Sequence, residues 1–241
     1  GFNVDFAPVA DVLSNPENTV VKKRSFGADP KLVTAMTAAF AEGLQSKGIL
    51  GSYKHFPGHG ATAGDTHKGY SYTDKTLEEL KACELLPFMD GISRNIPMIM
   101  VGHISLPKVI GDDTPASLSS YIMTDLLREE LGYKGIIITD ALAMKAVINE
   151  YSSDEAAVRA LEAGADILLL PEDFELAFQG VLQAVNEGRL SRERLDQSLQ
   201  RIIRQKLWLK EQAAENPKPE AAVIREGEEA ANIGEGETNG E

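Results

Sequence analysis

Short, almost continuously apolar segments alternate with longer amphipathic segments along most of this chain. The apolar segments span residues 2–9, 49–53, 97–101, 135–138 and 166–170. Strands that are buried on both faces of a parallel sheet have such unbroken runs of apolar residues. Their alternation with helices predicts an α/β protein, built either as a (β/α)-barrel or as a doubly wound sheet.

The segments between the strands carry helix signals. Apolar residues recur at helical spacing over residues 31–47, and Gly48 is a suitable C-terminal cap. Thr76 and Glu79 have the spacing of a capping box, at the start of a helix predicted over residues 76–93. Further helices are predicted over residues 119–131, 154–163, 174–186 and 191–210. Each strand is therefore followed by a helix.

Polar residues follow several of the predicted strands and favour the barrel. They are Asp11, His55, His103 and Asp140. An α/β barrel assembles its active site from the C-terminal ends of many strands. No G-x-G-x-x-G follows a strand and no P-loop occurs, which argues against the common nucleotide-binding folds. The five βα units are about three fewer than an eight-stranded barrel needs.

The composition fits one globular domain with an acidic tail. With 241 residues and 43% hydrophobic content, the chain can bury a substantial core. The net charge of −13 argues against a nucleic-acid or anionic-membrane partner. Nine Glu against Lys218 and Arg225 give residues 211–241 a net charge of −7. We therefore predict a folded domain over residues 1–210 and a disordered tail over residues 211–241.

Cysteine content and the chain start leave the cellular location open. Cys83 is the only cysteine, which fits a reducing compartment without excluding secretion. No run of about 18 apolar residues occurs, so no transmembrane segment is predicted. The chain opens on Gly1 with neither a methionine nor a signal-like segment, which suggests that the sequence begins inside a longer protein.

The second predicted strand runs into a loop rich in Gly and His. The loop opens with the motif KHFPGHG at residues 54–60, and His55, His59 and His67 lie within thirteen residues. α/β proteins often place their chemistry in such loops. Any one of these histidines could instead make local hydrogen bonds in a turn. Metal binding is another alternative, but no H-x-H or H-E-x-x-H pair supports a metallohydrolase.

Six motifs, in this order, resemble the β-N-acetylglucosaminidase branch of glycoside hydrolase family 3. They are GFNVDFAPVADV, KRSFG, KHFPGHG followed by D-x-H, MVGHISLP, GIIITDALAMKAV and GADILLLP. The resemblance extends over roughly residues 1–210. It implies a (β/α)8 TIM-type barrel that is incomplete at the N-terminus, because family members carry the missing βα units upstream of the first strand found here.

The resemblance also implies a reaction and the residues that perform it. Family members remove terminal β-linked N-acetylglucosamine with retention, through a covalent intermediate that would form on Asp140. The general acid/base would be His67, oriented by Asp65. The residues that would bind the sugar are Asp11, Arg24, Lys54, His55 and His103.

The residues themselves are compatible with these catalytic roles. Cleavage with retention usually needs two carboxyl groups about 5 to 5.5 Å apart. Asp140 follows three isoleucines and Thr139 at the end of a predicted strand, although a helix N-cap would occupy the same position. No second carboxylate is comparably placed. A hydrogen bond from Asp65 could set the tautomer of His67, which titrates near neutral pH and could donate and then accept a proton.

Several alternatives stay open at this level. Asp11 could form an Asx turn, Arg24 could be a solvated charge and Lys54 could belong to a structural ion pair. The substrate could be a cell-wall muropeptide, a chitin oligomer or another N-acetylglucosaminide, and phosphate could replace water as the acceptor. We expect a monomer that binds a small carbohydrate and needs no metal or cofactor. A β-glucosidase, a metallohydrolase and a non-catalytic glycan-binding fragment are the competing hypotheses.

Overall fold

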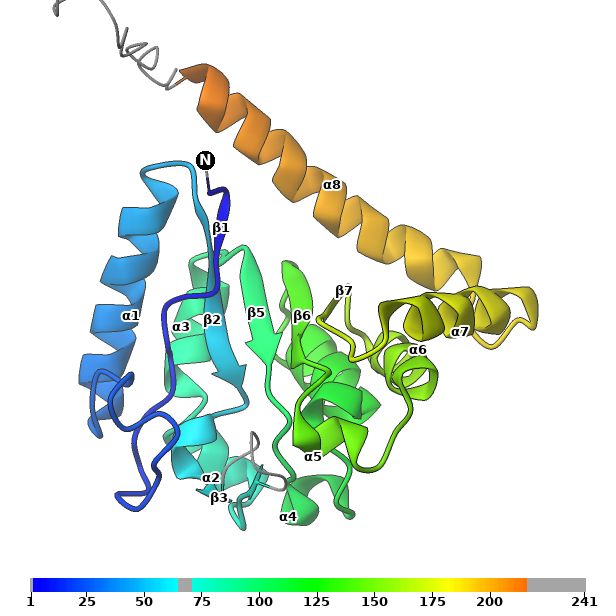
Figure 1. Cartoon of the computed structure of the whole chain (residues 1–241). Coiled ribbons are helices and arrows are strands. Elements are labelled where there is room, and N and C mark those ends of the chain that lie inside the picture. Colours follow the sequence, from blue (N-terminus) through cyan, green and yellow to red (C-terminus); the bar gives the residue numbers. More distant parts are fainter. Residues whose placement is uncertain (1, 65–70, 216–241) are drawn as a thin grey trace, which may run out of the picture.

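A five-stranded parallel sheet is the framework of the computed structural model, which describes residues 2–64 and 71–215. Its strand order is β1-β2-β5-β6-β7 (Figure 1). These strands are β1 (Val4–Asp5), β2 (Leu50–Phe56), β5 (Met98–Val101), β6 (Ile136–Ala141) and β7 (Ile167–Leu169). A separate antiparallel pair consists of β3 (Ala63–Gly64) and β4 (Ser71–Tyr72). Every neighbouring pair in the main sheet is parallel, which confirms the predicted α/β class.

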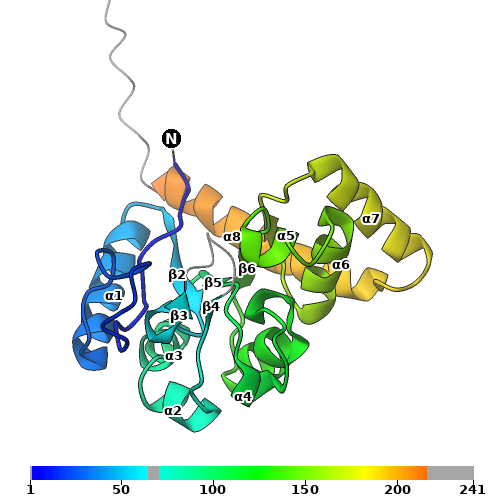
Figure 2. The same ribbon diagram turned by 60° about the horizontal axis from the view of Figure 1, so that its bottom comes forward.

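Helices flank the sheet and cover one of its ends. They are α1 (Pro30–Gln45), α2 (Leu77–Ala82), α3 (Leu86–Ser93), α4 (Pro107–Ile110), α5 (Lys145–Ile148), α6 (Ser153–Ala163), α7 (Phe174–Asn186), α8 (Arg192–Glu215), the short turns η1 (His59–Ala61) and η2 (Ala116–Leu118), and the π-type helix η3 (Tyr121–Glu130). Figure 1 shows α8 running diagonally past the end at which the strands begin. Figure 2 shows α2 and α4 at the opposite end. Among the described residues, no helix is long and apolar enough to cross a membrane.

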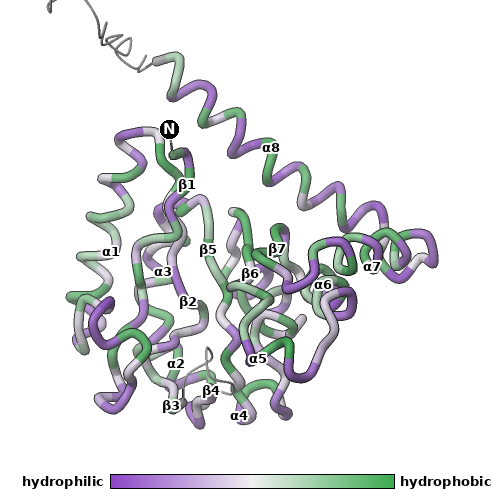
Figure 3. Tube along the Cα trace, viewed as in Figure 1, coloured by the Kyte–Doolittle hydropathy of each residue, from purple (hydrophilic) through white to green (hydrophobic). Residues whose placement is uncertain are grey.

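The sheet buries apolar side chains on both of its faces. Ile99 of β5 packs with Phe88 of α3 in one cluster. Its neighbours Met98 and Met100 belong to a second cluster, which includes Trp208 of α8. Successive strand residues point to opposite faces, so a strand with helices on both sides is apolar at every position. The apolar colouring of β5 and of the start of β6 in Figure 3 follows from this packing.

Two helices differ from the sequence prediction. The helix predicted over residues 76–93 is divided into α2 and α3. Pro87 lies in the first turn of α3 and has no N–H with which to continue a helix from α2. The last helix continues past residue 210 to Glu215, because Glu, Gln and Ala over residues 211–215 are good helix formers. Residues 211–215, which the sequence analysis placed in the disordered tail, are thus helical, and residues 216–241 lie outside the described part of the chain.

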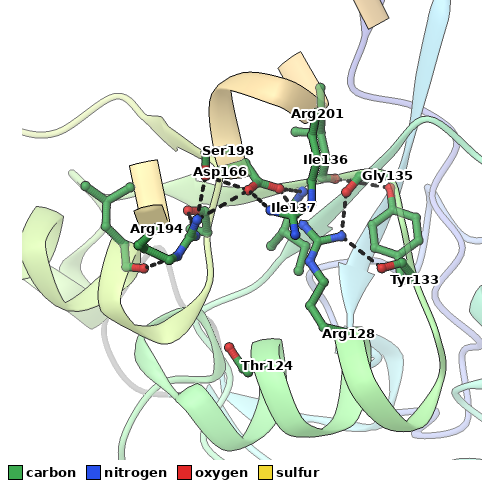
Figure 4. A network of polar contacts seen from close by, with 12 residues as sticks. Thr124, Arg128, Tyr133, Gly135, Ile136, Ile137, Asp166, Arg194, Ser198 and Arg201 are labelled. Carbon is green, nitrogen blue, oxygen red and sulfur yellow. Dashed lines mark hydrogen bonds and ion pairs between the residues drawn. The ribbon is translucent and has the colours of Figure 1, made fainter. Parts of the chain in front are cut away.

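A buried carboxylate attaches α8 to the end of the sheet at which β6 and β7 begin (Figure 4). Asp166 directly precedes β7 and is almost fully buried. Its partners are the backbone N–H of Ile137, the hydroxyl of Ser198 and the guanidinium groups of Arg128, Arg194 and Arg201. Burial lowers the pKa of Arg128 to about 10, while the charge of Asp166 acts in the opposite direction. This Asp166 network joins η3, β6 and β7 to α8.

Candidate active site

The C-terminal ends of β2, β5 and β6 lie next to one another and carry predicted site residues. Lys54 and His55 belong to the end of β2, His103 follows β5, and Asp140 is the second-last residue of β6. Adjacent parallel strands end at the same edge of a sheet, and the pairings β2–β5 and β5–β6 make these three ends neighbours. Within residues 2–64 and 71–215, no three His, Cys, Asp or Glu side chains are grouped as metal ligands.

Two glycines let the loop after β2 pack closely against its surroundings. Gly58 has a φ of 128°, and a Cβ at this position would lie 2.6 Å from the Cβ of Glu84. A Cβ on Gly60 would lie 1.9 Å from the carbonyl oxygen of Val12. Only glycine fits at both positions, which explains why the KHFPGHG motif has its two glycines where it does.

Asp11 makes hydrogen bonds to two histidines of the KHFPGHG motif. Its carboxylate is fully buried and accepts hydrogen bonds from the backbone N–H of His55 (3.0 Å) and of His59 (2.7 Å). The Nδ1 of His55 lies 2.7 Å from the second oxygen. A carboxylate only accepts, so Nδ1 of His55 carries the proton in this contact, and Nε2 is an acceptor whenever the ring is neutral. Both oxygens of Asp11 therefore face the loop, which supports a positioning role in place of the predicted sugar contact.

The buried groups around Asp11 should make the protein less stable in acid. Burial raises the pKa of Asp11, but the charges of His55 and His59 and the hydrogen bonds from His55 lower it overall. A carboxylate with a lowered folded pKa stabilises the fold above its unfolded value of about 3.9 and loses this contribution as the pH falls through the folded pKa. Burial also lowers the pKa of His59, so unfolding takes up a further proton below about pH 6.5.

We expect the urea midpoint to fall between pH 7 and pH 2, and Asp11→Asn to remove part of the fall that lies below about pH 5, where an unfolded aspartate starts to take up its proton. At pH 7 the substitution should cost about 2 to 3 kcal/mol, because an amide cannot accept from donors on both sides. Equal pH profiles for the two proteins would show that Asp11 does not contribute to the effect.

Asp140 lies within β6 as a partly buried, ionised carboxylate. One of its oxygens accepts a hydrogen bond from the backbone N–H of Ala141 (2.8 Å). Burial alone would raise the pKa of Asp140, but the nearby His55, His103 and Lys54 and the hydrogen bond from Ala141 lower it overall. The carboxylate is therefore ionised at neutral pH, as an attacking nucleophile must be.

Lys54 lies within electrostatic reach of Asp140, and Arg24 lies within reach of Lys54. Burial lowers the pKa of Lys54, and the charge of Arg24 acts in the same direction, while Asp140 and Asp11 raise it. Arg24 comes from the long loop after β1 and is exposed, with its Nε donating to the carbonyl oxygen of Val20 (3.3 Å). The structure thus brings Arg24 and Lys54 to the same region, and their binding of a sugar stays a prediction.

His103 is buried, with both ring nitrogens in contact with the chain. Its Nδ1 lies 2.6 Å from the hydroxyl oxygen of Ser117, and its Nε2 lies 2.8 Å from the carbonyl oxygen of Ala141. Only 2% of His103 is exposed, so the predicted sugar contact does not fit this geometry. Ser117 was not predicted, because nothing in the pattern of residues around it indicates that its hydroxyl meets a histidine.

The predicted acid/base residues Asp65 and His67 lie outside the residues that the structure describes. On either side of them, β3 and β4 pair with each other. The backbone N–H of Ser105 donates to the carbonyl oxygen of Ser71 in β4 (2.9 Å). The β3–β4 pair is thereby attached to the segment that follows β5, close to His103.

The fold and the position of these residues define an α/β domain of the TIM-barrel kind, with polar residues gathered at the C-terminal ends of its strands. Residues 1–205 match the model of the glycosyl hydrolase family 3 N-terminal domain. The chain therefore belongs to glycoside hydrolase family 3, as its motifs predicted.

Three known proteins illustrate the relationship. Beta-hexosaminidase A of Pseudoalteromonas piscicida is 37% identical over 234 residues, which cover 89% of this chain and 39% of that protein. The structure of a family 3 β-N-acetylglucosaminidase from Paenibacillus sp. str. FPU-7 matches with a TM-score of 0.84 and 39% identity, over 86% of this chain and 40% of that one. The β-glucoside phosphorylase BglX matches with a TM-score of 0.83 and 28% identity, over 90% and 40%. The chain thus spans about two fifths of the length of each.

Proposed function

We propose that the complete natural protein is a retaining glycoside hydrolase that removes terminal β-linked N-acetylglucosamine. The observation that carries this proposal is the ionised carboxylate of Asp140 at a strand end, close to His55, His103 and Lys54. The names of two relatives, a beta-hexosaminidase and a β-N-acetylglucosaminidase, support the choice of sugar. Cell-wall muropeptides and chitin-type oligomers are the substrates that carry such a sugar.

The reaction would have two steps. Asp140 attacks C1 of the terminal sugar while the bond from C1 to the leaving oxygen breaks. His67 gives its proton to that oxygen, and Asp65 holds the imidazole in the required tautomer. His67 then takes a proton from water, which attacks C1 and releases Asp140. Two inversions at C1 leave the original β configuration.

Sugar binding would use residues from the loop after β1 and the end of β2. Arg24 and Lys54 would donate hydrogen bonds to sugar hydroxyls. His55 would accept one through Nε2, because its Nδ1 is already bonded to Asp11. Asp11 would act indirectly, by fixing the orientation of the His55 ring.

Turnover of a chromogenic N-acetylglucosaminide by the complete natural protein tests this function. The matching glucoside is the control for the sugar, and NMR of the first product formed should show the β anomer. A chelator should leave the rate unchanged, whereas a metallohydrolase would lose activity. A purified, folded protein that does not release N-acetylglucosamine would reject the proposal.

A phosphorolytic or β-glucosidase-type reaction is the second candidate, because one structural neighbour is named a β-glucoside phosphorylase. A neutral histidine base would tolerate an anionic phosphate acceptor near the site. Phosphate would then attack C1 in the second step, and the product would be a sugar 1-phosphate. The ratio of sugar 1-phosphate to free sugar at increasing phosphate concentration separates the two reactions.

The Asp65 and His67 roles give a prediction about leaving groups. In the complete protein, His67→Ala should severely lower turnover of substrates with poor leaving groups, because these need protonation, and general acid catalysis contributes roughly 10²- to 10⁴-fold. An activated phenol leaves without a proton, so its release should suffer less. Asp65→Ala should be milder than His67→Ala, since Asp65 orients the ring and does not transfer the proton. Equal losses for good and poor leaving groups would show that His67 is not the acid.

A further inference from the structure

The end of β6 needs support at Asp140, because the pairing with β7 is irregular there. Ile138 is opposite Ile167 and Ala141 is opposite Leu169, so three steps along β6 match two along β7. Such a β-bulge redirects side chains and is common beside active sites. Regular pairing with β7 therefore does not fix the direction of the Asp140 carboxylate.

The peptide that follows the bulge is held from both sides. On the β7 side, the N–H of Leu142 donates to the carbonyl oxygen of Leu169 (2.8 Å). On the β5 side, Nε2 of His103 lies 2.8 Å from the carbonyl oxygen of Ala141. A carbonyl oxygen only accepts, so Nε2 of His103 carries the proton in this contact.

Ser117 favours that protonation state of His103. Its hydroxyl oxygen lies 2.6 Å from Nδ1, and the serine is fully buried. With the proton on Nε2, the Nδ1 of a neutral ring accepts from the hydroxyl. Ser117 is itself fixed, because the backbone N–H of the preceding Ala116 donates to the carbonyl oxygen of Ile104 (2.8 Å).

We propose that His103, held by Ser117, is a positioning residue for Asp140. It fixes the Ala141 carbonyl beyond the bulge, and thereby the direction in which the neighbouring carboxylate points. The proposal rests on the nucleophilic role of Asp140 proposed above. It replaces the sugar contact that the sequence suggested for His103, because a ring with two occupied nitrogens and 2% exposure has no free edge for a hydroxyl.

Two amide substitutions in the complete protein separate the two ring contacts. In His103→Gln, the amide nitrogen lies near the place of Nε2 and can donate to Ala141. In His103→Asn, the shorter amide reaches only the place of Nδ1, beside Ser117. We expect His103→Asn to lower kcat about 100-fold with little change in KM, the effect of displacing a reacting group by about 1 Å. His103→Gln should keep kcat within about tenfold of the wild type, because it retains the hydrogen bond.

A second measurement tests whether the effect acts through Asp140. In Asp140→Ala, azide can replace the missing nucleophile, and no carboxylate is left to position. Adding His103→Asn to that variant should then change the azide-dependent rate by no more than about twofold. Nitrogen-15 NMR of the wild type should show His103 protonated at Nε2 and not at Nδ1, which checks the inferred tautomer without any substitution.

Several results would overturn the positioning role. A raised KM with unchanged kcat in His103→Asn would indicate a sugar contact, and equal losses in the Asn and Gln variants would exclude the Ala141 hydrogen bond. The same loss in the azide-rescued background would show that His103 does not act through Asp140. Normal turnover in Asp140→Ala alone would instead reject the proposed nucleophile, so the two failures are distinguishable.

Discussion

Asp140→Ala should lower kcat of the complete protein by roughly four orders of magnitude or more, the scale on which removing a covalent nucleophile acts. No other described carboxylate lies at the end of β6, and the surrounding His55, His103 and Lys54 favour its ionised form. The fold should persist, because among the described residues this carboxylate accepts a hydrogen bond only from the adjacent Ala141. Thermal midpoints of the two proteins should therefore be similar.

Azide should partly restore turnover of an activated substrate by the Asp140→Ala protein. It fits the vacated space and attacks C1 from the side of the missing carboxylate, so the product should be the α-glycosyl azide. Asp112→Ala is the matched control, because Asp112 is an exposed loop aspartate that accepts from the backbone N–H of Thr114. Near-normal turnover in Asp140→Ala would remove this residue from the mechanism.

The strands were predictable because their composition reflects burial on both faces. Met98, Ile99 and Met100 alternate between two apolar clusters, and this packing leaves no polar position in β5. The interruption between α2 and α3 was harder to predict. The capping box at the start of α2 is a strong local signal, whereas the effect of Pro87 depends on where the chain must turn to pack on the sheet.

The strand-end residues of the site were predictable, but most of their partners were not. Lys54, His55 and Asp140 each follow or end an apolar run, and parallel pairing then brings them together. The contact between Asp11 and His55 joins residues 44 positions apart, and that between His103 and Ser117 joins residues 14 apart. Such contacts depend on tertiary geometry that no local pattern encodes.

These partners change how the polar residues should be interpreted. A carboxylate and an imidazole at strand ends resemble sugar-binding groups in the sequence, yet Asp11 and His103 are buried and contact other groups of the chain. Residues that bind a ligand and residues that orient the binding residues can have the same types of side chain. The hydrogen-bond partners of each side chain distinguish them, and these partners become known only with the fold. The roles of Asp65 and His67 remain predictions.

Asp166→Ala should cost the largest amount of stability of any single substitution considered. Asp166 is 6% exposed and is the common partner of Arg128, Arg194 and Arg201. Removing one partner of a buried ion pair typically costs about 3 to 5 kcal/mol, because the remaining charge is left without compensation. Against a total stability of about 5 to 15 kcal/mol, that loss would detach α8 or unfold the protein at moderate urea.

The matched control removes an exposed carboxylate from an ion pair at the surface. Glu162 pairs with Arg189 at the surface, where both side chains are more than 30% exposed, and Glu162→Gln should cost less than about 1 kcal/mol.

If Asp166→Ala does not fold, Asp166→Asn and Arg201→Met provide graded alternatives, and the substitution that removes more of the ion pairs should have the lower urea midpoint. Asp166 lies at the start of β7, whereas Asp140 lies near the end of β6, so kcat per folded molecule should not change. Midpoints that match the Glu162→Gln control would show that the network does not hold α8 on the sheet.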